Sequence, residues 1–76
     1  MDIKESVLSI VNEIRQSKGL AKFEELSDSD RLREDFEFTS FDLAELTVKI
    51  EDEFDIDIFE DGLVSTVGEI FAKLEA

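Results

Sequence analysis

The sequence predicts an all-α fold, a small antiparallel bundle of three main helices plus a short third helix or turn. Apolar residues recur at spacings of three and four in three separate stretches, as on the buried face of a helix. Each stretch also follows a residue that can cap a helix. The chain has 76 residues, which is room for one domain, so we expect a single domain over residues 1–76.

The first helix is expected from about Ile3 to Ser17. Asp2 can cap it, and Glu5, three residues later, completes a capping box. Gly19 suits the position just after the helix, where a left-handed backbone is common. The apolar face consists of Ile3, Val7, Ile10, Val11 and Ile14. Nothing on this helix indicates chemistry, so we interpret it as scaffold.

A long loop is expected between the first two helices, from Leu20 to Phe38. Periodicity weakens here, and the polar run at residues 27–30 indicates a turn. Loops of this length without structure are uncommon in small domains, so some of its residues should be anchored to the helices. Phe23, Leu26 and Leu32 are the candidates, with a short helical turn at Lys22–Leu26.

The second main helix is expected to begin near Ser40 and to end at about Phe54. Leu43, Leu46, Ile50 and Phe54 share one face of it. Two caps are compatible with the sequence: Thr39 with Asp42 as a capping box, or Ser40 itself. Either places Ser40 at the positive end of the helix dipole, where a phosphate on its hydroxyl would be favoured.

Residues 55–59 alternate acidic and apolar side chains, a pattern that taken alone indicates a strand. A single strand would have no partner, so we expect a bent connection that places Ile56 and Ile58 in the core. A short helix, or a single turn, should follow within Glu60–Val64, where Gly62 weakens helix formation.

The last helix is expected from about Val67 to Glu75. Thr66 followed by Glu69 predicts a capping box at its start. Its apolar face consists of Val67, Ile70, Phe71 and Leu74.

Acidic residues dominate the chain, which has a formal net charge of −13. Twelve acids and one base, Lys49, lie between Glu34 and Gly62. Such a field repels nucleic acid and anionic membranes and attracts basic protein surfaces. A plainer interpretation is a solvated acidic surface that keeps a small protein soluble.

The chain contains no histidine and no cysteine, which removes the usual zinc ligands and the usual general base. No calcium loop is predicted either, because Arg33 and Glu60 replace the required glycine after the aspartates at 28–30 and 55–57. The nearest following lysine, Lys49, is nine residues from Ser40, so no base is available for a serine nucleophile. We therefore expect neither a metal site nor catalysis. The absence of a long apolar run predicts no membrane insertion and a cytoplasmic location.

Three stretches carry a resemblance to a known family: Asp35-Phe36-Glu37, Thr39-Ser40-Phe41 and Glu51-Asp52-Glu53-Phe54. They resemble the Asp-Leu-Gly, Asp-Ser-Leu and Glu-Glu-Glu-Phe signatures of acyl carrier proteins and related phosphopantetheine carrier domains. The resemblance also covers length, helix order and charge. It implies that Ser40 carries 4′-phosphopantetheine, attached covalently from coenzyme A by a phosphopantetheinyl transferase.

The resemblance further implies a monomeric carrier that holds an acyl group as a thioester and presents it to biosynthetic enzymes with basic surface patches. The residues expected to contact such patches, on the exposed side of the second helix, are Asp42, Glu45, Glu51 and Asp52. Two alternatives stay open. One is a carrier for an amino-acyl or specialised acyl group, and the other is an unmodified acidic module that binds a basic protein.

Two positions depart from the family pattern. Thr39 replaces the aspartate before the serine, and Glu37 replaces the glycine. Thr39 can still cap the helix, and it indicates a dedicated set of partners outside bulk fatty acid synthesis. Phe36, Phe38 and Phe41 predict an aromatic surface near the arm.

Overall fold

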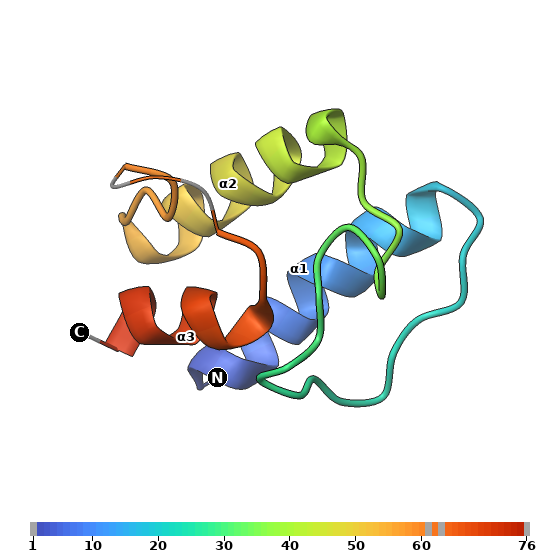
Figure 1. Ribbon diagram of the computed structural model, residues 1–76, viewed down its shortest axis with the longest axis horizontal. Coiled ribbons are helices and arrows are strands. Elements are labelled where there is room, and N and C mark those ends of the chain that lie inside the picture. Colours follow the sequence, from blue (N-terminus) through green and yellow to red (C-terminus); the bar gives the residue numbers. More distant parts are fainter. Residues whose placement is uncertain (1, 61, 63, 76) are drawn as a thin grey trace.

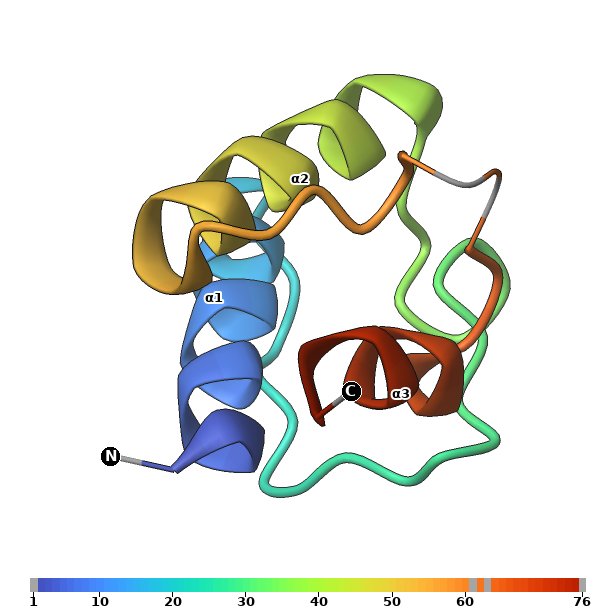
Figure 2. The same ribbon diagram turned by 90° about the vertical axis from the view of Figure 1, so that its left-hand side faces the viewer.

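The computed structural model describes residues 2–60, 62 and 64–75, and this part of the chain contains three α-helices (Figure 1). They are α1 (Ile3–Ser17), α2 (Ser40–Phe54) and α3 (Val67–Glu75). In Figure 1, α1 runs from left to right, whereas α2 and α3 run from right to left. The helices are splayed, since α3 is seen nearly end-on in Figure 2 while α1 stands upright. The three main helices are therefore confirmed at their predicted bounds. None of these helices is long and apolar enough to cross a membrane.

Each end of α1 is closed by the residues that the sequence predicts. The Asp2 side chain accepts a hydrogen bond of 2.8 Å from the Glu5 N–H. At the other end, Gly19 has a φ of +80°. The N–H groups of Gly19 and Leu20 donate to the carbonyl oxygens of Gln16 and Arg15, respectively. This pair of bonds is the Schellman arrangement that ends many helices.

The other two helices begin with threonine caps. Thr39 and Asp42 form the predicted capping box at the start of α2. At the start of α3, the Thr66 hydroxyl accepts from the Glu69 N–H, and the Glu69 carboxylate accepts from the Thr66 N–H. α2 ends at Phe54, and the following residue, Asp55, has a left-handed backbone with a φ of +59°.

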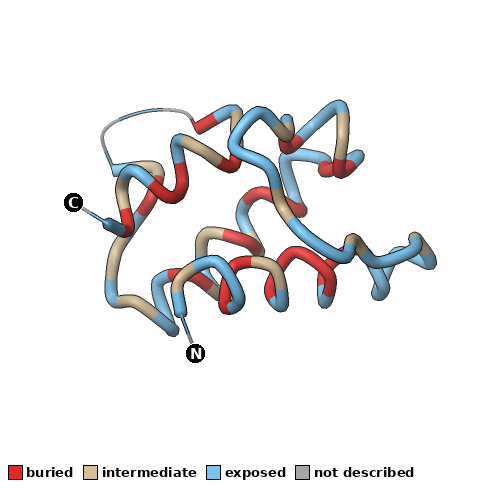
Figure 3. Tube along the Cα trace, turned by 90° about the horizontal axis from the view of Figure 1, so that it is seen from below, coloured by how far each residue is buried: buried red, intermediate tan, exposed pale blue. Residues whose placement is uncertain are grey.

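The core lies where the buried faces of the three helices meet, as the buried segments in Figure 3 show. α1 packs against both α2 and α3. Leu46 and Ile50 of α2 are fully buried, as are Val7 and Val11 of α1. The remaining buried apolar side chains are Ile10, Ile14, Leu32, Phe36, Phe38, Leu43, Ile58, Val64, Val67, Ile70, Phe71 and Leu74.

The long connection from α1 to α2 is held against the core without a helix of its own. Leu32 is buried, and Phe23 and Leu26 pack partly buried against the core, as predicted. The prediction of a helical turn at Lys22–Leu26 is wrong, because this segment has no helical residues and only a bend at Glu24. The side-chain amide of Asn12 explains the difference. Its oxygen accepts from the Phe23 N–H and its nitrogen donates to the Phe23 carbonyl, so the backbone groups there bond to α1.

The same connection is tied to the start of α3 by an antiparallel bridge between Arg31 and Thr66. The Leu32 N–H donates to the Ser65 carbonyl, and the Val67 N–H donates to the Asp30 carbonyl, each at 2.9 Å. Neither contact was predicted. The bridge holds the loop next to the start of α3, and both of its residues line the cavity that is described below.

The connection from α2 to α3 bends into the core. Ile58 is fully buried and Ile56 is partly buried, as expected for a bent segment and not for a strand. Residues 58–60 form a turn. The short helix expected within Glu60–Val64 is not found in the described part of the chain, and two residues of that range, Asp61 and Leu63, lie outside it. The described fold therefore has three helices and not four.

Candidate functional site

Ser40 is the first residue of α2, and its side chain is exposed. The preceding residue, Thr39, is the N-cap, with an extended backbone (φ −86°, ψ 176°). This decides between the two caps that the sequence allowed. Because Thr39 performs the capping, the Ser40 hydroxyl is available at the surface for another role.

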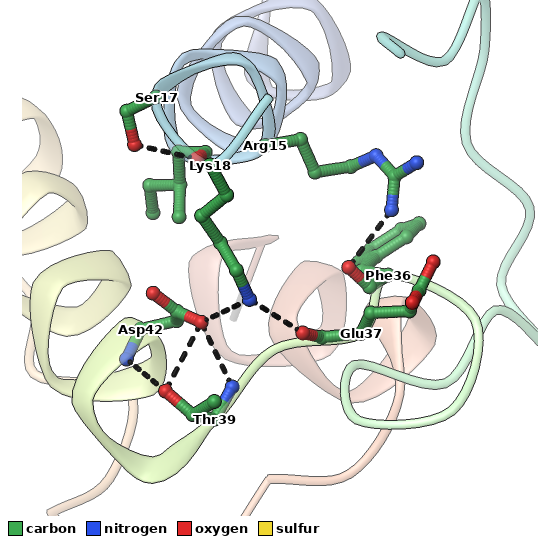
Figure 4. Close-up of polar contacts among 8 residues, drawn as sticks. Arg15, Ser17, Lys18, Phe36, Glu37, Thr39 and Asp42 are labelled. Atoms are coloured by element: carbon green, nitrogen blue, oxygen red, sulfur yellow. Dashed lines mark hydrogen bonds and ion pairs between the residues drawn. The ribbon is translucent and has the colours of Figure 1, made fainter. Parts of the chain in front are cut away.

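Lys18, at the end of α1, braces the turn that presents Ser40 (Figure 4). Its amino group donates to Asp42 Oδ2 and to the Glu37 carbonyl oxygen, both at 2.6 Å. The same Asp42 oxygen accepts from the N–H and the hydroxyl of Thr39. One carboxylate oxygen thus joins α1, the loop and the first turn of α2.

Asp42 is buried, with 6% of its surface exposed, so its expected position on the exposed side of α2 is wrong. Burial by itself would raise the pKa of Asp42, but hydrogen bonds from Lys18 and Thr39 outweigh burial and lower the pKa below its ordinary value. The carboxylate is therefore held charged in the first turn of α2. The contacts of Asp42 are with Lys18 and Thr39, within the fold.

The segment before Ser40 is also fixed from α1 by a buried arginine. Arg15 donates from Nη1 to the Phe36 carbonyl at 2.8 Å and from Nε to the Ala21 carbonyl at 2.8 Å. Glu37 has a φ of +61°, a left-handed backbone that usually requires glycine. Glu37 stands where the family signature has glycine, and its backbone adopts a conformation that glycine favours.

The prediction of an aromatic surface near Ser40 is largely wrong. Phe36 and Phe38 are buried and contact each other, with ring centroids 5.6 Å apart. Only Phe41 points outward, with 79% of its surface exposed. Arg15 and Lys18, at the end of α1, donate to the carbonyl oxygens of Phe36 and Glu37, and these contacts hold the segment against the core.

Arg33 is the residue near Ser40 that sequence reasoning missed. Its guanidinium Nη2 donates to Ser40 Oγ at 3.0 Å, and both side chains are exposed. Since arginine stays protonated at any ordinary pH, the hydroxyl has a fixed positive charge beside it. The signal in the sequence was the presence of a cation directly before the acidic stretch, seven residues before the serine.

An open cavity of about 290 Å³ lies beside Ser40. Its apolar walls are Leu32, Leu43, Phe59 and Val64. Leu43, Phe59 and Arg33 also line the shallow depression that contains Ser40, so the depression and the cavity adjoin. A group attached to Ser40 would therefore meet an apolar recess within the same face.

The remaining acidic candidates lie along α2. Glu51 and Asp52 are exposed, and Glu45 is half-buried near Lys49. Lys49 forms an ion pair of 2.5 Å with Glu13 of α1. Within the described ranges, no group of three or more acidic side chains could hold a metal ion.

The chain was compared with protein-family models, with curated proteins and with solved structures. A protein-family model described as a phosphopantetheine attachment site matches residues 18–74. The matched range begins at Lys18, the brace of the turn, and includes all of α2 with Ser40. No curated protein and no solved structure gave a significant match.

Proposed function

The chain belongs to the phosphopantetheine attachment site family, and from this membership we propose that Ser40 is the residue that receives the 4′-phosphopantetheine arm. Domains of this family serve as carriers, with the arm covalently attached. The observation that supports Ser40 is its position as the exposed first residue of α2, with Thr39 as the cap. A phosphate attached there lies at the positive end of the helix dipole.

The other serines lack this combination of exposure and helix position. Ser6 is buried in α1, and the Ser17 hydroxyl donates to the Ile14 carbonyl at 2.7 Å. Ser9 lies within α1, and Ser27, Ser29 and Ser65 lie in connections. Of the seven serines in the sequence, Ser40 alone begins a helix with an exposed hydroxyl.

The residues around Ser40 fit the group that the family attaches. Loading would form a bond between Ser40 Oγ and the phosphorus that bears pantetheine, and would break the pyrophosphate bond of coenzyme A, releasing adenosine 3′,5′-bisphosphate. The proton of the hydroxyl must go to a base. The polar neighbour of Ser40 Oγ is the Arg33 guanidinium, which is already protonated and cannot accept it. We therefore propose that a transferase supplies the base.

We further propose that the cargo is an acyl group, held as a thioester on the thiol that the arm supplies. The apolar cavity beside Ser40 supports this choice over an amino-acyl group, because its walls offer contact to hydrocarbon. A specialised acyl group from a dedicated biosynthetic cluster fits equally well. Thr39 in place of the family's aspartate supports a dedicated set of partners.

Partner enzymes with basic patches would approach along α2. Glu51 and Asp52 are exposed there, and Glu45 is half-buried on the same helix. Opposite charges across an interface steer encounter and raise the association rate. Asp42 is omitted from this set because Lys18 and Thr39 already occupy its carboxylate.

The test is the intact mass after incubation with coenzyme A and a promiscuous transferase. The wild type should gain the mass of one phosphopantetheine, Ser40→Ala should gain none, and Ser65→Ala should match the wild type. Loading of Ser40→Ala would refute the site. No loading of the wild type, under conditions that load a known carrier, would refute the carrier and favour an unmodified acidic module.

A further inference from the structure

Two arginines flank Leu32 in the turn before α2, and their surroundings differ. Arg31 faces the carboxylates of Glu34 and Asp35, at 3.8 and 3.4 Å. Arg33 forms no ion pair with any residue that the structure describes, and its guanidinium instead donates to Ser40 Oγ. Among the residues that the structure describes, Arg33 is thus a cation that has no ion-pair partner and contacts the one atom proposed to gain a phosphate.

We propose that Arg33 is a positioning residue for the arm and that its guanidinium pairs with the phosphate once Ser40 is loaded. This inference rests on the proposed attachment at Ser40. The non-bridging oxygens of a phosphodiester on Oγ lie two bonds from an atom that Arg33 already contacts at 3.0 Å. A small rotation of the guanidinium therefore exchanges a neutral acceptor for an anionic one, which arginine can bind with two parallel hydrogen bonds.

The covalent bond places this exposed pair at the upper end of the range for surface ion pairs. Surface pairs are weak because two long side chains must be ordered in water. Here the phosphate is fixed to the first residue of α2, so only the arginine has to be ordered.

The pairing would also determine the side of Ser40 on which the arm leaves. Arg33, Leu43 and Phe59 line both the depression at Ser40 and the apolar cavity. A phosphate held by Arg33 therefore starts the arm on the cavity side, and Phe41 lies outside this set of lining residues. Arg33 thus binds the phosphate at the attachment point and directs the arm toward the apolar cavity that contacts the cargo.

The experiment compares four full-length proteins, each before and after loading: wild type, Arg33→Gln, Arg33→Lys and Arg31→Gln. Loading with coenzyme A and transferase is carried to completion and checked by intact mass. Two quantities are then measured at low ionic strength: the change in Tm on loading, and the side-chain Nε–Hε resonances of the arginines. Arg31→Gln is the matched control, since it removes the same charge two residues away.

Loading should raise the Tm of the wild type by about 2–5 °C more than that of Arg33→Gln, as a surface-scale pair in a domain of this size would give. Arg31→Gln should show the wild-type increment even if its unloaded form is less stable. Arg33→Lys should recover part of the increment, and the difference should shrink as salt rises. In the wild type, the Arg33 resonance should shift on loading while that of Arg31 stays in place.

Complete loading with equal Tm increments for Arg33→Gln and Arg31→Gln would overturn the inference and leave the attachment at Ser40 intact. An Arg33 resonance that does not respond to loading would overturn it as well. A wild type that takes no arm would instead refute the attachment and, with it, this inference. A merely structural role for Arg33 would change the Tm of both forms equally, so the increment separates the two roles.

Discussion

The amino group of Lys18 lies 2.6 Å from Asp42 Oδ2, and this ion pair joins the residue after α1 to the first turn of α2 across 24 positions of sequence. The same oxygen serves the capping box of Thr39. The pair therefore determines where α2 begins relative to α1. Since Ser40 lies between Thr39 and Asp42, its placement depends on this contact.

Lys18→Met should lower the free energy of unfolding by about 1–2 kcal/mol, because it leaves a buried carboxylate with Thr39 alone and removes the bond to the Glu37 carbonyl. Lys22→Met is the matched control, since Lys22 is exposed in the loop. It should stay within about 0.5 kcal/mol of the wild type. Urea denaturation measures the stability of both variants. Equal midpoints would contradict the stabilising role of Lys18.

Acidification should reveal the same contact. The pKa of Asp42 is lowered from its ordinary value of 3.8, so its contribution is complete above that pH and is lost as pH falls through the folded-state pKa. Asp42→Asn lacks this contribution. The difference in the free energy of unfolding between wild type and Asp42→Asn should therefore be constant above about pH 5. It should decrease toward zero as the pH falls below the ordinary pKa. Thermal unfolding of both proteins from pH 7 down to strongly acidic pH provides the check. A difference that persists at the lowest pH would show that charge on Asp42 contributes nothing.

Leu46→Ala should cost about 2–5 kcal/mol, because Leu46 is fully buried at the centre of the α2 face. That is a large share of the total free energy of unfolding of so small a domain. Val48→Ala, two residues on, is the control, since 60% of Val48 is exposed. It should be near neutral, as alanine also favours the helix. Chemical denaturation that ranks the two variants equally would mean that the buried face is misassigned.

Glu37→Gly should stabilise the protein by about 0.5–1 kcal/mol. A non-glycine residue at φ +61° carries a steric cost that glycine avoids, and this gain exceeds the added freedom of the unfolded chain. The carbonyl that Lys18 binds is retained in the variant. Glu34→Gly removes the same charge from the neighbouring turn and should not stabilise. Equal melting temperatures for the two variants would count against strain at Glu37.

Reversal of charge on α2 should slow loading without changing the fold. Glu45→Lys combined with Asp52→Lys should reduce the initial rate of modification several-fold at low salt, and the deficit should shrink as salt rises. The control reverses Glu24 and Glu25, which are exposed in the loop, and has the same net charge. Initial rates by intact mass compare the two. If both double variants slow equally, net charge and not the face of α2 governs encounter.

The sequence alone determined the helices and the position of Ser40. The bounds of α1, α2 and α3 and the caps at Asp2, Thr39 and Thr66 could be predicted. These features depend on contacts between residues three or four apart, and such contacts are present in any stretch that becomes helical. The position of Ser40 could be predicted for the same reason, because Ser40 is defined by the start of a helix.

Only the tertiary structure decided which polar and aromatic residues around Ser40 are free. Asp42 was expected outside and Phe36 and Phe38 near the surface, yet all three are buried. Two contacts depend on the path of the loop between α1 and α2. Lys18 contacts Glu37 across 19 positions of sequence, and Arg33 contacts Ser40 across seven. That path is set by the bridge between Arg31 and Thr66 and by the left-handed turn at Glu37. Neither has a periodic signal, because the pairing partner lies in another element and the backbone angle is imposed by packing.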